Sequence, residues 1–111
     1  MTGITTHILD LTTGTPAAGV AVTLEQASVT GWAVLARATT DADGRVRDAF
    51  AAVPVAGRFR LTFATGAWFA ARGVTSFHPE VSVVFDVTDT QPHHHVPLLL
   101  SPFGYSTYRG S

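Results

Sequence analysis

The sequence contains no cysteine, no lysine and only one methionine among its 111 residues. The lack of cysteine excludes disulfide bonds, thiolate nucleophiles and thiolate metal sites, so the fold depends on packing alone. Charged residues make up only 14% of the chain, below the roughly one quarter usual in globular domains. Because the basic residues are scattered arginines and the formal net charge is −1, no basic stripe is available for phosphates. We therefore expect no nucleic-acid partner.

Long hydrophobic runs are also missing. No stretch approaches the roughly 20 apolar residues of a membrane-spanning helix, and the N-terminus lacks the basic flank and apolar core of an export signal. We expect a cytoplasmic protein without membrane contact, and we assign residues 1–111 to a single domain. Because 46% of the residues are hydrophobic, we also expect some apolar surface to be buried between subunits of an oligomer.

Apolar and polar residues alternate along several segments, which is the pattern of half-buried β-strands. The clearest segment, residues 81–88, places Val81, Val83, Phe85 and Val87 on one face. The same alternation occurs at residues 20–24 and 59–63. Turn-forming Gly, Pro and Asp residues separate the segments at 13–16, 41–44, 56–57 and 89–92. The pattern predicts an all-β protein built as an antiparallel sandwich.

One segment departs from this alternation. Residues 65–73 are rich in alanine, contain Trp68 and Phe69, and end at Gly73, which suits a helix C-terminus. We expect a short helix there. No internal repeat or low-complexity tract divides the chain further.

Three consecutive histidines, His93 to His95, precede an apolar run. Because successive strand residues face opposite ways, His93 and His95 point to one side and His94 to the other. With His7 or His78 as a third ligand, the pair would suit zinc, although no metal signature of fixed spacing is present. The simpler interpretation makes His93 and His94 solvent-exposed turn residues before the strand, and we favour it for these two.

Two further residues, His7 and Arg45, indicate a functional site only if other functional groups lie near them. His7 lies in the expected first strand, residues 4–10, where a lone histidine is more often structural than catalytic. Two imidazoles close together would divide the roles of base and acid around one water molecule. Arg45 follows the 41–44 turn, and its planar fork suits an anionic or carbonyl-rich ligand, a role for which Arg47 and Arg109 compete. The closing residues, 108–111, are either a frayed end or part of a site.

Seven short motifs carry a family resemblance: HILD at 7–10, TGTPA at 13–17, GW at 31–32, TDADGR at 40–45, FHPEV at 77–81, HVPLLLSP at 95–102 and YSTYRGS at 105–111. They resemble the 5-hydroxyisourate hydrolases, the enzyme branch of the transthyretin family. The resemblance implies a transthyretin-like sandwich of about eight strands with one short helix. It also implies a homotetramer, a dimer of dimers, with catalytic sites in a channel between the dimers.

The implied reaction is hydrolysis of 5-hydroxyisourate, the product of urate oxidation, to 2-oxo-4-hydroxy-4-carboxy-5-ureidoimidazoline in purine degradation. The resemblance implies no cofactor and no metal. Residues matching the family's catalytic positions are His7, Arg45, His95 and Ser111. Those implied to bind or surround the substrate are His7, Arg45, Tyr108 and Ser111. Which histidine is the base, and whether Ser111 acts through its hydroxyl or its carboxylate, stays open.

Position 94 departs from the family, whose members often carry an aromatic residue there, so no role is carried over to His94. Two other classes of function compete with the hydrolase. One is a binding protein like the vertebrate thyroid-hormone carrier, which shares the fold without the histidine and tail set. The other is a metal-dependent hydrolase that uses His7, His93 and His95.

Overall fold

The computed structural model describes residues 3–50, 56–88 and 93–110. In chain order, the elements within these residues are β1 (Gly3–Asp10), β2 (Thr15–Pro16), β3 (Ala21–Ser28), β4 (Gly31–Thr39), β5 (Arg45–Val46), β6 (Gly57–Phe63), α1 (Thr65–Ala70), β7 (Val81–Val87), β8 (His93–Ser101) and β9 (Gly104–Thr107). The expected all-β architecture with one short helix is confirmed.

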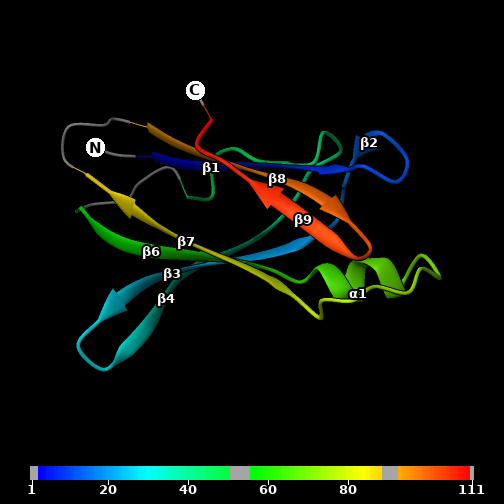
Figure 1. Ribbon diagram of the computed structural model, residues 1–111. Coiled ribbons are helices and arrows are strands. Elements are labelled where there is room, and N and C mark those ends of the chain that lie inside the picture. The colour runs from blue at the N-terminus through cyan, green and yellow to red at the C-terminus, as the bar shows by residue number, and fades with distance from the viewer. Residues whose placement is uncertain (1–2, 51–55, 89–92, 111) are drawn as a thin grey trace.

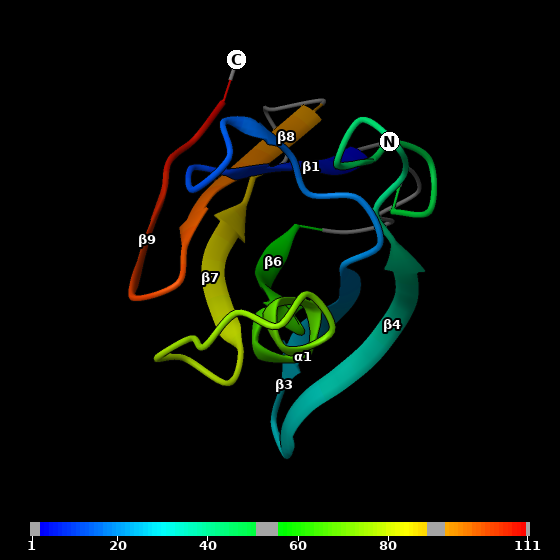
Figure 2. The same ribbon diagram turned by 90° about the vertical axis from the view of Figure 1, so that its right-hand side faces the viewer.

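The strands form two sheets that face each other as layers (Figure 1). One sheet has the order β2-β1-β8-β9, with the short β5 paired to β1, and the other has the order β4-β3-β6-β7. Figure 1 also shows α1 at one end of the two layers, and Figure 2 views the molecule from that end. The sandwich inferred from the alternating pattern is therefore correct. Strands β7 and β9 each lie at the end of their sheet.

Alternating side chains fill the space between the two layers. Phe59, Leu61 and Phe63 of β6 are fully buried, and they belong to the same core as Ile8 of β1 and Leu98 of β8. Burial of each such side chain stabilises the fold by about 1.5–3 kcal/mol relative to exposure. Because strand side chains alternate, the residues between these core positions lie on the outer faces. The outer face of β1 and β8 carries His7, His93 and His95.

One strand pair differs from the antiparallel expectation. β1 and β8 run parallel, from Gly3 opposite His93 to Asp10 opposite Leu100. Alternation shows which face of a strand is buried, but it carries no information about the direction of the neighbouring strand. The antiparallel prediction is wrong for this pair, while the pairs β3·β4, β3·β6, β6·β7 and β8·β9 are antiparallel as expected.

The helix is shorter than the segment that predicted it. α1 ends at Ala70, and Gly73 adopts a left-handed backbone with φ of 70° in the turn that follows. Trp68 and Phe69 point into the core, as their aromatic character suggests. No helix within the described ranges is long and apolar enough to cross a membrane.

Candidate active site

Three strands bring the expected site residues to the same outer face. His7 on β1 lies opposite Arg45 on β5 in the antiparallel register. Thr5, two residues earlier on β1, lies opposite His95 on β8 in the parallel register. Because residues two apart on a strand share a face, Thr5 and His7 lie on one side, and His93 joins His95. The fold thus gathers residues from both ends and the middle of the chain.

A groove of about 430 Å³ opens on this face. All but one of its lining residues are polar, and the complete lining is Thr5, Thr6, Arg45, Val46, Arg47, His93 and His95. His7 does not line the groove itself. It lies close enough to Arg45 and His95 for their charges to influence one another. The groove is therefore lined by two of the four residues expected to be catalytic, Arg45 and His95, and His7 lies beside them on the same outer face.

The turn at residues 41–44 fixes the position of Arg45. The Asp41 carboxylate accepts hydrogen bonds from the backbone N–H of Asp43 at 2.9 Å and of Arg45 at 3.0 Å. Gly44 adopts a φ of 73°, and a Cβ there would lie 2.5 Å from the carbonyl oxygen of Ile8. The hydrogen bond from the Arg45 backbone lowers the pKa of Asp41, so the carboxylate stays charged at neutral pH. The TDADG motif thus fixes the backbone position of Arg45.

Of the three arginines considered for ligand binding, only Arg45 projects into the groove without an ion pair among the described residues. Arg47 also lines the groove, but its guanidinium contacts Asp41 at 3.3 Å and Asp43 at 2.8 Å. Arg109 lies at a different pocket, beside His94. The geometry favours Arg45 as the cation that meets a ligand.

Both histidines of the expected catalytic set favour the neutral form. Burial, followed by the positive charge of Arg45, lowers the pKa of His7 below 6.5, while a backbone hydrogen bond of Asp43 acts in the opposite direction. Burial and Arg45 also lower the pKa of His95, with smaller contributions from His93 and His7. A neutral imidazole has a lone pair that can accept a proton from water. This outer face therefore presents basic imidazole nitrogens beside the guanidinium of Arg45.

The groove also holds Thr5, which the sequence pattern did not indicate as a site residue. The Thr5 hydroxyl lies 2.9 Å from Nε2 of His93 and 2.8 Å from Nδ1 of His95. The alternating pattern of the first strand, which puts Thr5 on the same face as His7, was the available signal. That pattern does not reveal how β1 pairs with β8, and only this pairing places Thr5 opposite His95.

The interpretation of His93 and His94 as turn residues is wrong. β8 begins at His93, because its ladder with β1 starts at that residue, and His94 is only 4% exposed. His94 faces the interior between the sheets, where its Nδ1 has no hydrogen-bond partner. The opposite orientation of His94 from its two neighbours, expected from strand geometry, is confirmed. Only His93 is solvent-exposed, as proposed for both.

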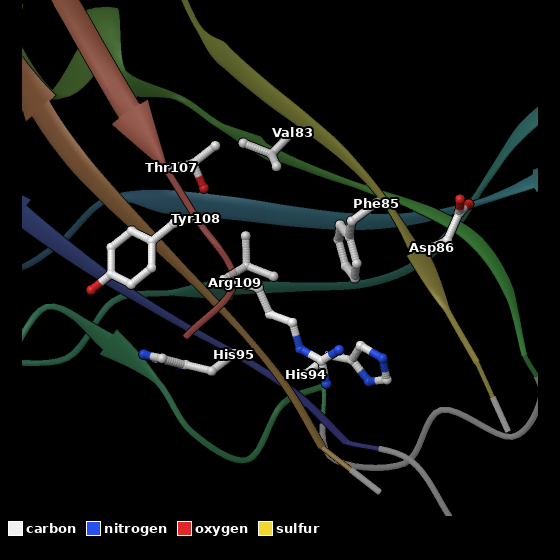
Figure 3. Close-up of a pocket in the computed structure, with 9 residues that line it drawn as sticks. Val83, Phe85, Asp86, His94, His95, Thr107, Tyr108 and Arg109 are labelled. Carbon is white, nitrogen blue, oxygen red and sulfur yellow. The ribbon is translucent and has the colours of Figure 1, made fainter. Parts of the chain in front are cut away.

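A second, smaller pocket of about 150 Å³ surrounds His94. Figure 3 shows the Arg109 side chain directed toward the His94 ring, with Tyr108 beside His95. Burial and then the charge of Arg109 lower the pKa of His94, so this imidazole is neutral as well. The rest of the pocket is lined by Val83, Phe85 and Asp86 of β7, Val96 of β8 and Thr107 of β9. The pocket lies at the open edge between β7 and β9.

The tail is ordered as far as the structure describes it. After β9, the backbone N–H of Gly110 donates to the carbonyl oxygen of His95 at 2.8 Å, and Arg109 donates to the carbonyl oxygen of His93 at 3.5 Å. Tyr108 is 57% exposed and borders His95 in the smaller pocket. Ser111, the fourth expected catalytic residue, lies outside the described residues. The tail thus packs directly against the strand that carries His95.

Metal binding was the other use considered for the histidines. Across the described ranges, no three His, Asp or Glu side chains are grouped closely enough to hold a metal ion. His93 and His95 each have one ring nitrogen within hydrogen-bond distance of the Thr5 hydroxyl. The groove is better suited to hydrogen-bonding an oxygen-rich ligand than to ligating a cation.

Comparison with known proteins identifies the family of the chain. A family model described as HIUase/Transthyretin family matches residues 4–110. The chain is 48% identical over 111 residues to a 5-hydroxyisourate hydrolase of Salmonella dublin, covering 97% of this chain and 80% of that protein.

Solved structures give the same result. The 5-hydroxyisourate hydrolase of Klebsiella pneumoniae superposes with a TM-score of 0.86 at 45% identity, covering 99% of this chain and all of that one. Sea bream transthyretin in complex with thyroxine superposes with a TM-score of 0.90 at 35% identity, covering 97% and 94% of the two chains. The sequence, the fold and these similarities agree, and this chain belongs to the HIUase/transthyretin family.

Proposed function

We propose that this chain hydrolyses 5-hydroxyisourate to 2-oxo-4-hydroxy-4-carboxy-5-ureidoimidazoline in urate degradation. The observation that carries the proposal is the convergence of His7, Arg45 and His95 on one outer face, in a chain 48% identical to a 5-hydroxyisourate hydrolase. Two neutral imidazoles beside an arginine suit the attack of water on a ring carbonyl. The reaction needs no metal and no cofactor in this proposal.

The histidines activate water and handle its proton. His7 and His95 hold a water molecule between them, and one of them removes a proton as the oxygen attacks the carbonyl carbon. The new C–O bond forms as the carbonyl π electrons move onto oxygen. Collapse of this intermediate breaks the ring C–N bond, and a protonated imidazole delivers the proton to the leaving nitrogen. The lowered pKa values of both histidines supply the neutral base that the first step requires.

Arg45 and the tail bind the substrate. The Arg45 guanidinium donates to the oxygens of the ring and stabilises the negative charge that develops on the attacked carbonyl. Tyr108 borders the substrate from the side of His95, which it neighbours in the structure. Ser111 completes the set by orienting the water or a histidine. Its place in the family's closing motif, YSTYRGS, is the support for that role.

A direct assay tests the activity. 5-Hydroxyisourate is produced freshly with urate oxidase, and its decay is followed by ultraviolet absorbance with and without this protein. We expect the added protein to accelerate the decay in proportion to its concentration, also after exhaustive chelation of metals. An unchanged decay rate refutes the hydrolase. Activity that disappears on chelation and returns with zinc supports the metal-dependent alternative instead.

A binding function is the second candidate, because the chain also resembles sea bream transthyretin solved with thyroxine. The same measurements separate the two. A carrier retains an aromatic ligand in equilibrium dialysis and leaves the decay of 5-hydroxyisourate unaffected. The groove favours the enzyme, since its lining is rich in histidine and arginine rather than in apolar side chains.

The assembly and setting belong to the same proposal. We expect residues 1–111 to act as one hydrolase domain in a cytoplasmic homotetramer, a dimer of dimers. Large apolar side chains on the surface support association, for example Phe77 and Phe103, each 70% exposed. Sedimentation equilibrium should give four times the 11.7 kDa chain mass. A monomer at micromolar concentration contradicts this part of the proposal.

A further inference from the structure

A single hydroxyl group lies between two imidazole rings in the groove. Oγ1 of Thr5 is 2.8 Å from Nδ1 of His95 and 2.9 Å from Nε2 of His93. The two rings are nearly parallel, with an interplanar angle of 22° and centroids 6.3 Å apart. The register of β1 with β8 produces this arrangement, because Thr5 pairs with His95 and His93 shares its face.

The hydrogen-bonding capacity of these groups restricts their proton positions. A hydroxyl has one hydrogen to donate, and a neutral imidazole has one N–H and one bare nitrogen. If Thr5 donates to His93, Nδ1 of His95 must carry its proton to complete the second hydrogen bond, and Nε2 of His95 is then bare. If Thr5 donates to His95 instead, His95 carries its proton on Nε2 and His93 donates from its own Nε2. The first state makes His95 a base at Nε2, and the second makes it an acid.

We propose that Thr5 and His93 are positioning residues that set which nitrogen of His95 carries the proton. The inference deepens the proposed hydrolysis, on which its catalytic consequence rests. The hydrogen bonds among Thr5, His93 and His95 in the protein without substrate can be measured independently of the catalytic activity.

The proton transfers from His95 through Thr5 to His93, called the relay below, form a closed and balanced cycle. Nε2 of His95 takes the proton of the attacking water, which makes the ring an imidazolium. Nδ1 of His95 then passes its proton to Oγ1 of Thr5, while the hydroxyl proton passes to Nε2 of His93. His95 becomes neutral with its proton on Nε2, and the positive charge resides on His93. Donation from Nε2 to the leaving nitrogen, with the proton of His93 returning through Thr5 to Nδ1, restores the starting state.

The surroundings favour moving the charge in this direction. His93 is exposed, so water can solvate its imidazolium form, whereas His95 is only partly exposed. The groups whose charges act on His95 are Arg45, His93 and His7. Of these, the permanent charge of Arg45 opposes a second cation in the groove. The relay moves the positive charge from His95, which lies near Arg45, to the exposed His93. The proton remains available for return to His95.

The test is the protonation pattern of His95 in the substrate-free protein, read from its ¹⁵N chemical shifts. Thr5→Val removes the hydroxyl while keeping the shape of the side chain, and Thr5→Ser restores it. We expect the native protein and Thr5→Ser to carry the resting proton on Nδ1 of His95, and Thr5→Val to show a mixture of both forms. The kcat of Thr5→Val should fall roughly tenfold with little change in KM, the scale seen when a group that orients a functional imidazole is removed.

Two further variants complete the test. His93→Phe keeps a ring at an exposed position and removes the accepting nitrogen, so it should shift the His95 pattern as Thr5→Val does. Thr39→Val, the same substitution on the exposed strand β4, should leave both measurements at native values.

Native ¹⁵N shifts in Thr5→Val and His93→Phe would overturn the relay, even if kcat fell. If the native protein fails to accelerate the decay of 5-hydroxyisourate, the proposed function is wrong, while the ¹⁵N shifts still decide the hydrogen-bond relation.

Discussion

At the residue scale, the site depends on keeping two imidazoles neutral beside a permanent cation. Burial contributes the larger part of this effect for both His7 and His95, and Arg45 adds to it. A neutral imidazole with a lowered pKa is a weaker base, but more of it is in the reactive form near neutral pH. In the proposed mechanism Arg45 therefore acts on the two histidines as well as on the substrate.

Removal of either histidine should stop most of the chemistry without unfolding the protein. We expect His7→Ala or His95→Ala to lower kcat by roughly a hundredfold or more, the scale for losing an acid or base. The spectroscopic decay assay measures this loss, and circular dichroism checks that the strands persist. Near-normal turnover in one variant would remove that histidine from the mechanism.

Replacement of Arg45 should separate its charge from its shape. Arg45→Gln removes the positive charge that lowers the pKa of His7 and His95, so both pKa values should rise. More imidazole is then protonated in mildly acidic solution, and the acidic limb of the kcat/KM profile moves to higher pH. Arg45→Lys keeps the charge and loses the planar fork, so its activity should fall without that movement. A limb that stays in place in Arg45→Gln contradicts the electrostatic role.

At the element scale, β8 and the tail form one unit around His95. Gly110 bridges to His95 through the backbone, and a Cβ on Gly110 would overlap the His95 ring. The glycine in the closing motif is therefore required by close approach to the imidazole. The tail limits the orientations that this ring can adopt.

Gly110→Ala should therefore damage the site more than the fold. The added methyl group must displace the His95 ring, and we expect kcat to fall by about tenfold or more, as for other errors in positioning a functional imidazole. The temperature of unfolding should change little, because Gly110 lies outside the core. Gly104→Ala is a matched control in the same tail, since nothing lies within 4 Å of a Cβ there. Equal effects of the two substitutions would show that the contact with His95 is unimportant.

The sequence predicted the individual strands and the helix better than it predicted which strands pair and in which direction. Alternation identified the buried faces of β6 and β7, and the family motifs predicted a set of site residues of which His7, Arg45 and His95 lie on one outer face. It missed the strand character of His93 and His94, because a run of histidines before an apolar segment has no hydrophobic alternation of its own. It also missed Thr5 as a partner of His95, since that contact follows from a parallel register between the two ends of the chain.

At the scale of the whole molecule, stability should depend on pH through three histidines whose pKa values are lowered in the folded chain. The pKa values of His7, His94 and His95 are all lowered from 6.5 in the folded chain. In the unfolded chain these groups bind protons at higher pH than in the folded chain. Stability should therefore fall as pH decreases below about 6.5, and it should level off once the folded-state pKa values are passed.

The substitution His94→Phe isolates one part of this effect. It removes an imidazole whose pKa is lowered by burial and whose Nδ1 has no hydrogen-bond partner. It should stabilise the fold by about 1–3 kcal/mol. The gain should be larger at pH 5.5 than at pH 8, because only the histidine form must resist protonation. Urea unfolding at both pH values measures it. A gain that is equal at the two pH values would mean that titration of His94 contributes nothing.

The parallel pairing of β1 with β8 also determines when the protein can become active during its synthesis. The two strands are separated by most of the chain, so β1 leaves the ribosome long before its partner exists. Contacts between distant segments form slowly, because the entropy of closing the intervening loop must be overcome first. The groove is therefore among the last features to form on the nascent chain. Until then β1 exposes an open edge rich in threonine and isoleucine, the kind of segment on which molecular chaperones act.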